Sequence, residues 1–352
     1  MSKVTLEAAW SSRQLPWRRR ALLGLEKLLG SSGLADVFGR MKPCAGATLL
    51  MYHSVVTHVE EAWIDPANSL PLDVFKSQME YLASRKCVIS MNQLVDRLEA
   101  GAAPEPGTVV ITFDDGYLDN RRWVAPLLRD LDLPATVYLA TGYIEQGLSQ
   151  WIDHLYTSFN RRTRDVLALD RGESFDLAIR DSLLLAHEAC ANTLIGMTMV
   201  ERSSFLDCLD QQLQPVGSPP RLTMDWDDVR QLKEQFPGVE IGVHTRDHMD
   251  LEKHESMALE QIESSIQDVR REIGCTPSHF SFPYCRSTND VQMMLRTTGL
   301  RSAVATSMGY LNSVDSDLFG LSRVEAPRSR ALFRLFVSGA YPALPMLMTR
   351  RA

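Results

Sequence analysis

Two aspartates stand side by side at the end of an apolar run, and no other feature of the chain restricts its fold as strongly. Residues 109–118 read VVITFDDGYL. The β-branched and aromatic residues of this run are typical of a buried strand, and Gly116 indicates a turn directly after it. The carboxyl ends of strands are where α/β sheets and barrels bind ligands. Because adjacent carboxylates repel each other unless a cation or a shared proton compensates, Asp114 and Asp115 predict a metal at this strand end.

Other apolar stretches alternate with segments that have helical spacing. Strands are expected at 47–55, 109–113, 134–140, 239–244, 279–284, 302–306 and 321–326. Helical spacing occurs at 72–84, 90–100 and 256–273, with Ser90 as an N-cap and Gly101 as a stop. This alternation predicts an α/β protein with a parallel sheet or barrel.

The chain is long enough for one barrel-sized domain with insertions, at 352 residues. We expect a main domain at 46–327, a basic amphipathic segment at 1–45 and a basic apolar tail at 328–352. Residues from about 147 to 220 are polar and helical without a convincing strand, which predicts a helical insertion. After it, Asp225 and Asp228 suggest a capping box that opens the next helix.

Charge is distributed unevenly along the chain, whose net charge is −7. Residues 1–45 hold eight Lys/Arg against three Asp/Glu, and residues 328–352 hold five Arg and no acid. These ends are either solvated surface or docking segments for an anionic membrane, since RRRALLGLEKLLG joins arginines to an apolar helical pattern. With no export signal, and six cysteines without a CxxC pair, we expect a cytoplasmic protein, peripheral on the inner face of the membrane, that binds no nucleic acid.

A second polar cluster follows another expected strand. His244 and His248 stand four apart in HTRDH, a spacing that lets two imidazoles reach one ion. Such a pair alone is usually a surface or packing feature. Together with a carboxylate from the paired aspartates it forms a two-His, one-Asp set that leaves a position for water, as in a catalytic zinc site.

The motifs TFDDGY and HTRDH resemble the first and second motifs of the polysaccharide deacetylase family, carbohydrate esterase family four, in their order over about 47–327. The resemblance implies a distorted (β/α) barrel and metal-assisted removal of an N-acyl group. It assigns Asp114 as the general base and Asp115, His244 and His248 as ligands of one divalent metal, zinc first, with nickel, cobalt or manganese as alternatives. The metal would activate a water from which the base takes a proton.

An amide also needs an acid that protonates its departing nitrogen. The chain lacks the late L-x-H-D motif that supplies this histidine in many members. His53, in LLMYHSV, resembles the early Y-H motif of a permuted branch that includes exopolysaccharide deacetylases. We therefore assign the acid to His53, with a buried structural histidine as the alternative.

The third motif departs from the family pattern R-P-P-Y-G, since the chain has SFPYC at 281–285. Ser281 replaces the arginine, and Cys285, a small packed residue in our interpretation, replaces the glycine. By resemblance, the backbone N–H of Tyr284 would help hold the oxyanion. Arg323 either takes over the role of the missing arginine, which keeps Asp114 ionised and oriented, or forms a surface salt bridge.

The expected function is removal of an N-acetyl or N-formyl group from an amino sugar, in a lipid-linked or nucleotide-linked precursor for polysaccharide biosynthesis. Trp151 and Asp153 in the insertion would bind the sugar, or else complete a small core. Two alternatives stay open: a metal-dependent amidohydrolase acting on a small non-sugar or cyclic amide, and a non-catalytic carbohydrate-binding relative.

Overall fold

The computed structural model describes residues 5–6, 46–169, 172–305 and 311–338. Nearly all of the expected N-terminal segment, and residues 339–352 of the expected tail, lie outside the described residues.

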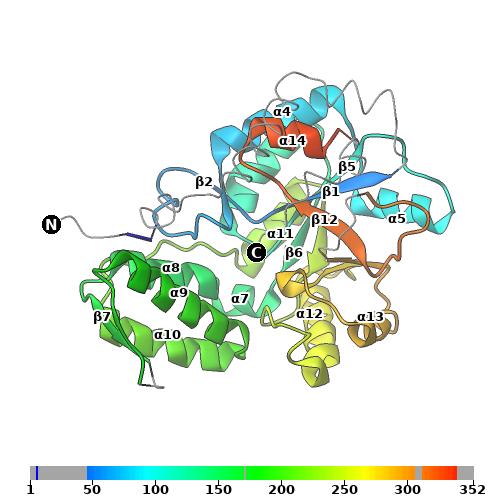
Figure 1. Cartoon of the computed structure of the whole chain (residues 1–352). Helices are drawn as coiled ribbons and strands as arrows, with labels where there is room; N and C mark the ends of the chain where they lie inside the picture. The colour runs from blue at the N-terminus through cyan, green and yellow to red at the C-terminus, as the bar shows by residue number, and fades with distance from the viewer. Residues whose placement is uncertain (1–4, 7–45, 170–171, 306–310, 339–352) are drawn as a thin grey trace, which may run out of the picture.

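Seven parallel strands close into a barrel (Figure 1). In order around the ring they are β1 (Ala47–Tyr52), β5 (Thr108–Phe113), β6 (Ala135–Leu139), β9 (Val239–Val243), β10 (His279–Ser281), β11 (Ser302–Ala305) and β12 (Leu321–Glu325). The ring closes because β1 pairs with β5 on one edge and with β12 on the other. Each strand falls within or next to a stretch where the sequence predicts one, and the predicted barrel is confirmed.

The barrel is distorted beside β5. A two-residue strand, β4 (Cys87–Val88), pairs with residues 108–109 of β5, whereas β6 pairs with residues 112–113. Since β1 occupies the whole opposite edge of β5, β4 and β6 share one edge, β4 at its amino half and β6 at its carboxyl half.

Side chains alternate between the interior of the barrel and the outer helices. Along β5, Val110 belongs to an interior cluster with Tyr138 of β6, while Ile111 and Phe113 pack in the outer core. The same alternation puts Asp114, one residue beyond the strand, on the interior side.

Helices surround the ring, and α5 (Met91–Glu99) closes it at the amino ends of the strands. They are α4 (Leu72–Arg85), α5 (Met91–Glu99), α6 (Ala125–Asp130) after a π-helical turn at Asn120–Val124, α7 (Thr141–Gln146), α11 (Trp226–Gln235), α12 (Ala258–Ile273), α13 (Asn289–Leu295) and α14 (Arg330–Phe336). Apolar residues of α5 join the interior cluster at the amino ends of the strands. Ser90 and Asp225 are the N-caps of α5 and α11, as predicted, and both form capping boxes.

The start of the expected C-terminal tail is part of this outer layer. Helix α14 packs against α4, with the ring of Phe333 against that of Tyr81. No helix in the described part of the chain is both long enough and apolar enough to span a bilayer.

The expected insertion forms a cap beside the barrel (Figure 1). It consists of α8 (Trp151–Arg161), α9 (Arg180–Ile195), α10 (Met199–Leu213) and an antiparallel hairpin of β7 (Val166–Ala168) with β8 (Ser174–Asp176). The expectation of no strand here is wrong, because three-residue strands are too short to show an alternating pattern. The cap has an apolar core of its own, built on Leu155, Leu183 and Leu206.

Candidate metal centre and active site

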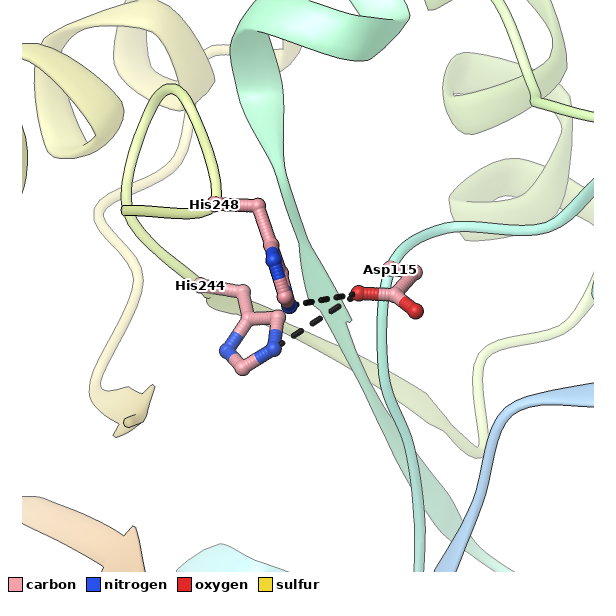
Figure 2. Close-up of side chains that lie close together, drawn as sticks. All are labelled: Asp115, His244 and His248. Carbon is pink, nitrogen blue, oxygen red and sulfur yellow. Dashed lines mark ion pairs between the residues drawn. The ribbon is translucent and has the colours of Figure 1, made fainter. Parts of the chain in front are cut away.

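Three side chains that the sequence predicts as metal ligands converge at the carboxyl ends of the strands. Asp115 follows β5, and His244 and His248 follow β9. Asp115 Oδ1 lies 3.3 Å from Nε2 of His248 and 3.6 Å from Nε2 of His244 (Figure 2). The three ligand atoms lie within 4.8 Å of one another, which is close enough to hold one ion.

The chain reaches this arrangement through unusual backbone. Asp115 has φ of 72°, Thr245 of 61° and His248 of 47°, all in the left-handed region that only glycine adopts freely. Such residues persist only where the surroundings over-determine them, and they cluster at functional sites. With these positive φ values, the loops that follow β5 and β9 bring Asp115, His244 and His248 together.

The imidazole of His244 is oriented by the neighbouring strand. Its Nδ1 donates to the carbonyl oxygen of Ser281 at 2.7 Å, which leaves Nε2 without a proton and facing Asp115. Burial lowers the pKa of His244, and burial together with His244 and Arg202 lowers the pKa of His248 well below its ordinary value. Both imidazoles are therefore neutral, the form that binds metal.

The residues present fit a divalent cation. Asp115 Oδ1 is buried and has no hydrogen-bond partner among the described residues. Burial and the charge of Asp114 raise the pKa of the Asp115 carboxyl well above its usual value as long as no cation is near. Two imidazole nitrogens and one carboxylate oxygen suit zinc, and also nickel, cobalt and manganese.

Asp114 has a different partner. Arg323 forms two hydrogen bonds to it, from Nη1 to Oδ1 at 2.7 Å and from Nη2 to Oδ2 at 2.6 Å, and both side chains are buried. Nη2 of Arg323 also donates to the hydroxyl of Ser281 at 2.7 Å. Burial alone would raise the pKa of Asp114, but Arg323 lowers it well below its usual range. Of the two alternatives for Arg323, the structure therefore supports the buried replacement over the surface salt bridge.

His53 lies next to this pair. The backbone N–H of Asp114 donates to the carbonyl of Tyr52 at 3.0 Å, so His53 and Asp114 follow paired residues of neighbouring strands. Burial lowers the pKa of His53, and the charges of Asp114 and Glu325 oppose this shift. His53 is thus at the barrel mouth, within electrostatic reach of the predicted base.

Tyr284 is held between the metal residues and the cap. Its φ is 56°, and its ring packs 4.7 Å from that of His248. The hydroxyl of Tyr284 accepts hydrogen bonds from Trp151 Nε1 and from Arg202, each at 3.0 Å. Trp151, which the sequence predicts as a sugar-binding residue, thus uses its indole N–H in a contact within the protein.

Asp153 is also engaged. It is 1% exposed, and its carboxylate accepts from the backbone N–H of Asp65 at 2.9 Å and from the hydroxyl of Tyr117 at 2.7 Å. Burial raises the pKa of Asp153 to about 8. These contacts fasten α8 to the barrel. Trp151 and Asp153 also border a cavity of about 390 Å³ between α8 and α10.

Two contributions of the cap escape sequence reasoning. Gln150 Nε2 donates to the carbonyl of Asp115 at 3.3 Å, and Arg202 of α10 reaches the His248 loop. Neither residue stands in a recognisable motif. The partner of each is distant in the sequence and is determined only by how the cap packs on the barrel.

The buried pair predicts a large cost for losing its arginine. Replacing Arg323 by Gln leaves Asp114 buried without a cation, which should lower the free energy of unfolding by about 3–5 kcal/mol in urea denaturation. The Asp114→Asn/Arg323→Gln double variant should recover part of the lost free energy of unfolding, because it removes the buried charge. Because Arg323 holds the pKa of Asp114 below its unfolded value, the stabilisation that the wild type gains from the ionised carboxylate should be complete above pH about 4 and should be lost as the pH falls below it, so the wild type and Arg323→Gln should differ least in acid.

The matched control is the exposed pair of Arg296 and Asp317. Its guanidinium likewise contacts both carboxylate oxygens, here through Nη2 alone, at 2.6 and 2.7 Å. Arg296→Gln should cost only about 0–1 kcal/mol. Equal costs for the two arginine variants would contradict the interpretation of Arg323 as the essential buried partner.

Several solved structures share this fold. The chain aligns with IcaB from Ammonifex degensii at 15% identity and a TM-score of 0.54, covering 84% of this chain and 98% of that one. A de-N-acetylase from Aggregatibacter actinomycetemcomitans gives 16% identity and a TM-score of 0.53, covering 82% and 99%. The Streptococcus pyogenes deacetylase PplD, solved in complex with acetate, gives 15% and 0.53, covering 81% and 93%. At these identities the likeness establishes the fold.

No curated protein matches the chain at a significant level. The family model described as polysaccharide deacetylase does match, over residues 101–303. That match covers more than half of the chain and contains both the paired aspartates and the two histidines. The chain therefore belongs to the polysaccharide deacetylase family.

Proposed function

We propose that this protein is a metal-dependent N-deacetylase that removes an acetyl or formyl group from an amino sugar. One observation carries the proposal: the adjacent aspartates have separate partners. Asp114 is paired with Arg323, while Asp115 faces His244 and His248. An ionised base beside a three-ligand metal site is the arrangement that amide hydrolysis needs.

Each step falls to a residue at the barrel mouth. A divalent ion bound by Asp115 and the two histidines would supply Lewis-acid polarisation of the amide carbonyl and of water. Asp114, kept ionised by Arg323, takes the proton of the attacking water. The backbone N–H of Tyr284 donates to the oxyanion, and His53 gives a proton to the departing nitrogen. The lowered pKa of His53 makes its protonated ring a stronger acid.

The substrate we propose is an amino sugar in a cytoplasmic glycan precursor, lipid-linked or nucleotide-linked. Support comes from family membership and from the neighbours: PplD was solved with acetate, the product of a deacetylation. The cap stands beside the site, where it can limit the size of the glycan that enters.

We further propose that the protein docks on an anionic membrane. Nearly all of residues 1–45, which motivate this proposal, lies outside the described residues, but a groove of about 610 Å³ adds support. Its lining includes Arg85, Lys86, Arg330 and Arg334, with Glu80 as an acidic member. The groove lies near the amino ends of the strands, opposite the site. If the protein bound the membrane through this groove, the barrel mouth would face away from the bilayer. This orientation favours a soluble, nucleotide-linked substrate over one anchored in the lipid.

The two aspartates should separate metal binding from catalysis. Asp115→Asn should lose bound zinc in elemental analysis together with activity, while Asp114→Asn should keep zinc and lose about 100- to 10,000-fold in rate. Activity is measured as acetate or formate released from nucleotide-linked and lipid-linked N-acyl sugars. Asp114→Asn with near wild-type turnover would refute the assignment of the base. Hydrolysis of small non-sugar or cyclic amides alone, detected for a cyclic amide by the carboxylate and amine that ring opening produces, would favour the amidohydrolase alternative.

The activity lost on replacing His53 should be larger for a substrate with a poorer leaving group. His53→Ala should lose most activity on an N-acetyl sugar, whose nitrogen needs a proton to depart, and little on p-nitrophenyl acetate, which needs none. In the wild type, activity on the amide should fall as the pH rises and His53 loses its proton. Equal loss on both substrates would argue for a structural histidine.

Membrane docking should depend on the basic ends. Changing Arg18, Arg19 and Arg20 together to Glu should release the protein from phosphatidylglycerol vesicles at low salt and leave activity on a soluble substrate unchanged, because each cation near an anionic surface contributes about 1 kcal/mol. Raising the salt should have the same effect. If the intact protein does not sediment with these vesicles at low salt, the membrane proposal is wrong.

A further inference from the structure

One arginine of the cap contacts the loop of His248 and the loop of Tyr284. Arg202, in α10, is 1% exposed, and its Nε donates to the carbonyl of Leu194 within the cap at 2.9 Å. Its Nη1 donates to the carbonyls of Asp247 at 3.0 Å and His248 at 3.1 Å. Its Nη2 donates to the hydroxyl of Tyr284 at 3.0 Å. One side chain therefore links the cap to two separate strand-end loops of the barrel.

These loops need an external support. His248 and Tyr284 both have positive φ, 47° and 56°, a strained conformation that persists only where the surrounding structure holds it. Their rings pack edge to face, 4.7 Å between centroids, so a shift of one displaces the other. The hydroxyl of Tyr284 also lies 3.3 Å from the carbonyl of His248, on which Arg202 converges as well.

The contacts suit a guanidinium and no other cation. Arginine presents its donors in a rigid planar fork, so one nitrogen can reach two successive carbonyls while another reaches the phenol. A lysine ammonium is a single point on a flexible stem and cannot span these acceptors together. The acceptors are neutral, so the purpose of the contacts is to fix the position of the loops.

We propose that Arg202 is a positioning residue for the metal centre: it holds the His248 and Tyr284 loops in the geometry that binds the ion. The cap then completes the site as well as standing beside it. This proposal rests on the proposed metal function of Asp115, His244 and His248.

The cap offers a matched control for the loss of a buried arginine. Arg162, at the end of α8, is also 1% exposed and donates to the carbonyls of Phe159 at 2.7 Å and Leu177 at 2.8 Å. These partners belong to the cap, whereas two loops of the barrel accept from Arg202. A role that is only structural predicts similar behaviour for both residues.

The experiment compares zinc binding by the full-length wild type, Arg202→Lys and Arg162→Lys in isothermal calorimetry, with the unfolding temperature of each apo protein measured alongside. Arg202→Lys should bind zinc about 10- to 100-fold more weakly, the usual effect of losing a residue that supports a ligand. Arg162→Lys should lower the unfolding temperature and keep the wild-type Kd. Added methylguanidinium should restore part of the zinc affinity of Arg202→Ala.

Tyr284→Phe provides a second variant, since it keeps the ring against His248 and removes only the hydroxyl that Arg202 contacts. It should weaken zinc binding in the same direction, and it decides the matter if the arginine variants do not fold. The proposal would be overturned if folded Arg202→Lys bound zinc with wild-type affinity. If the arginine variants do not fold, wild-type zinc affinity in Tyr284→Phe would overturn it. Absence of zinc binding by the wild type would instead overturn the metal site itself, and the proposal with it.

Discussion

Two adjacent buried carboxylates cannot both be ionised unless each has its own compensating positive charge. In this protein Asp114 receives a permanent one from Arg323, which contacts both of its oxygens. Oδ1 of Asp115 has no hydrogen-bond partner among the described residues and faces two neutral imidazoles instead. The first carboxylate is thereby fixed as an anion available to accept a proton, and the second becomes stable as an anion only with an ion bound. The different roles proposed for these neighbours follow from this difference.

Closure of the barrel supplies the geometry. Asp114 and Arg323 are 209 residues apart, yet β1 pairs with β5 on one side and with β12 on the other, so both side chains enter the same interior. The cap adds a second layer of control, because the start of α8 contacts the Asp115 loop through Gln150 and Arg202 of α10 contacts the His248 loop. A fold without the cap would leave these strained loops with fewer supports.

The strands, and the convergence of one carboxylate of the aspartate pair with His244 and His248, could be predicted from the sequence, because the aspartates and His244 follow apolar runs and parallel strands bring their carboxyl ends together. The choice of Asp115 over Asp114 as the ligand comes from the family resemblance. The choice between two roles for Arg323 could not be made, since it depends on which strands become neighbours when the barrel closes. The side-chain contacts of Trp151 and Asp153 could not be predicted from the sequence either. Aromatic and acidic residues in a cap suggest a sugar site, and nothing in the sequence shows that Trp151 and Asp153 also contact Tyr284 and Tyr117, which are distant in the chain.

The most direct test of this account is the coordination of the bound ion, measured by X-ray absorption spectroscopy on the zinc-loaded protein. The account predicts two imidazole nitrogens, from His244 and His248, with oxygen completing the shell and no sulfur. His248→Ala should lose one imidazole contribution, and Asp114→Asn should leave the spectrum unchanged. A sulfur ligand, which would implicate Cys285, or a spectrum altered by Asp114→Asn but not by His248→Ala, would contradict it.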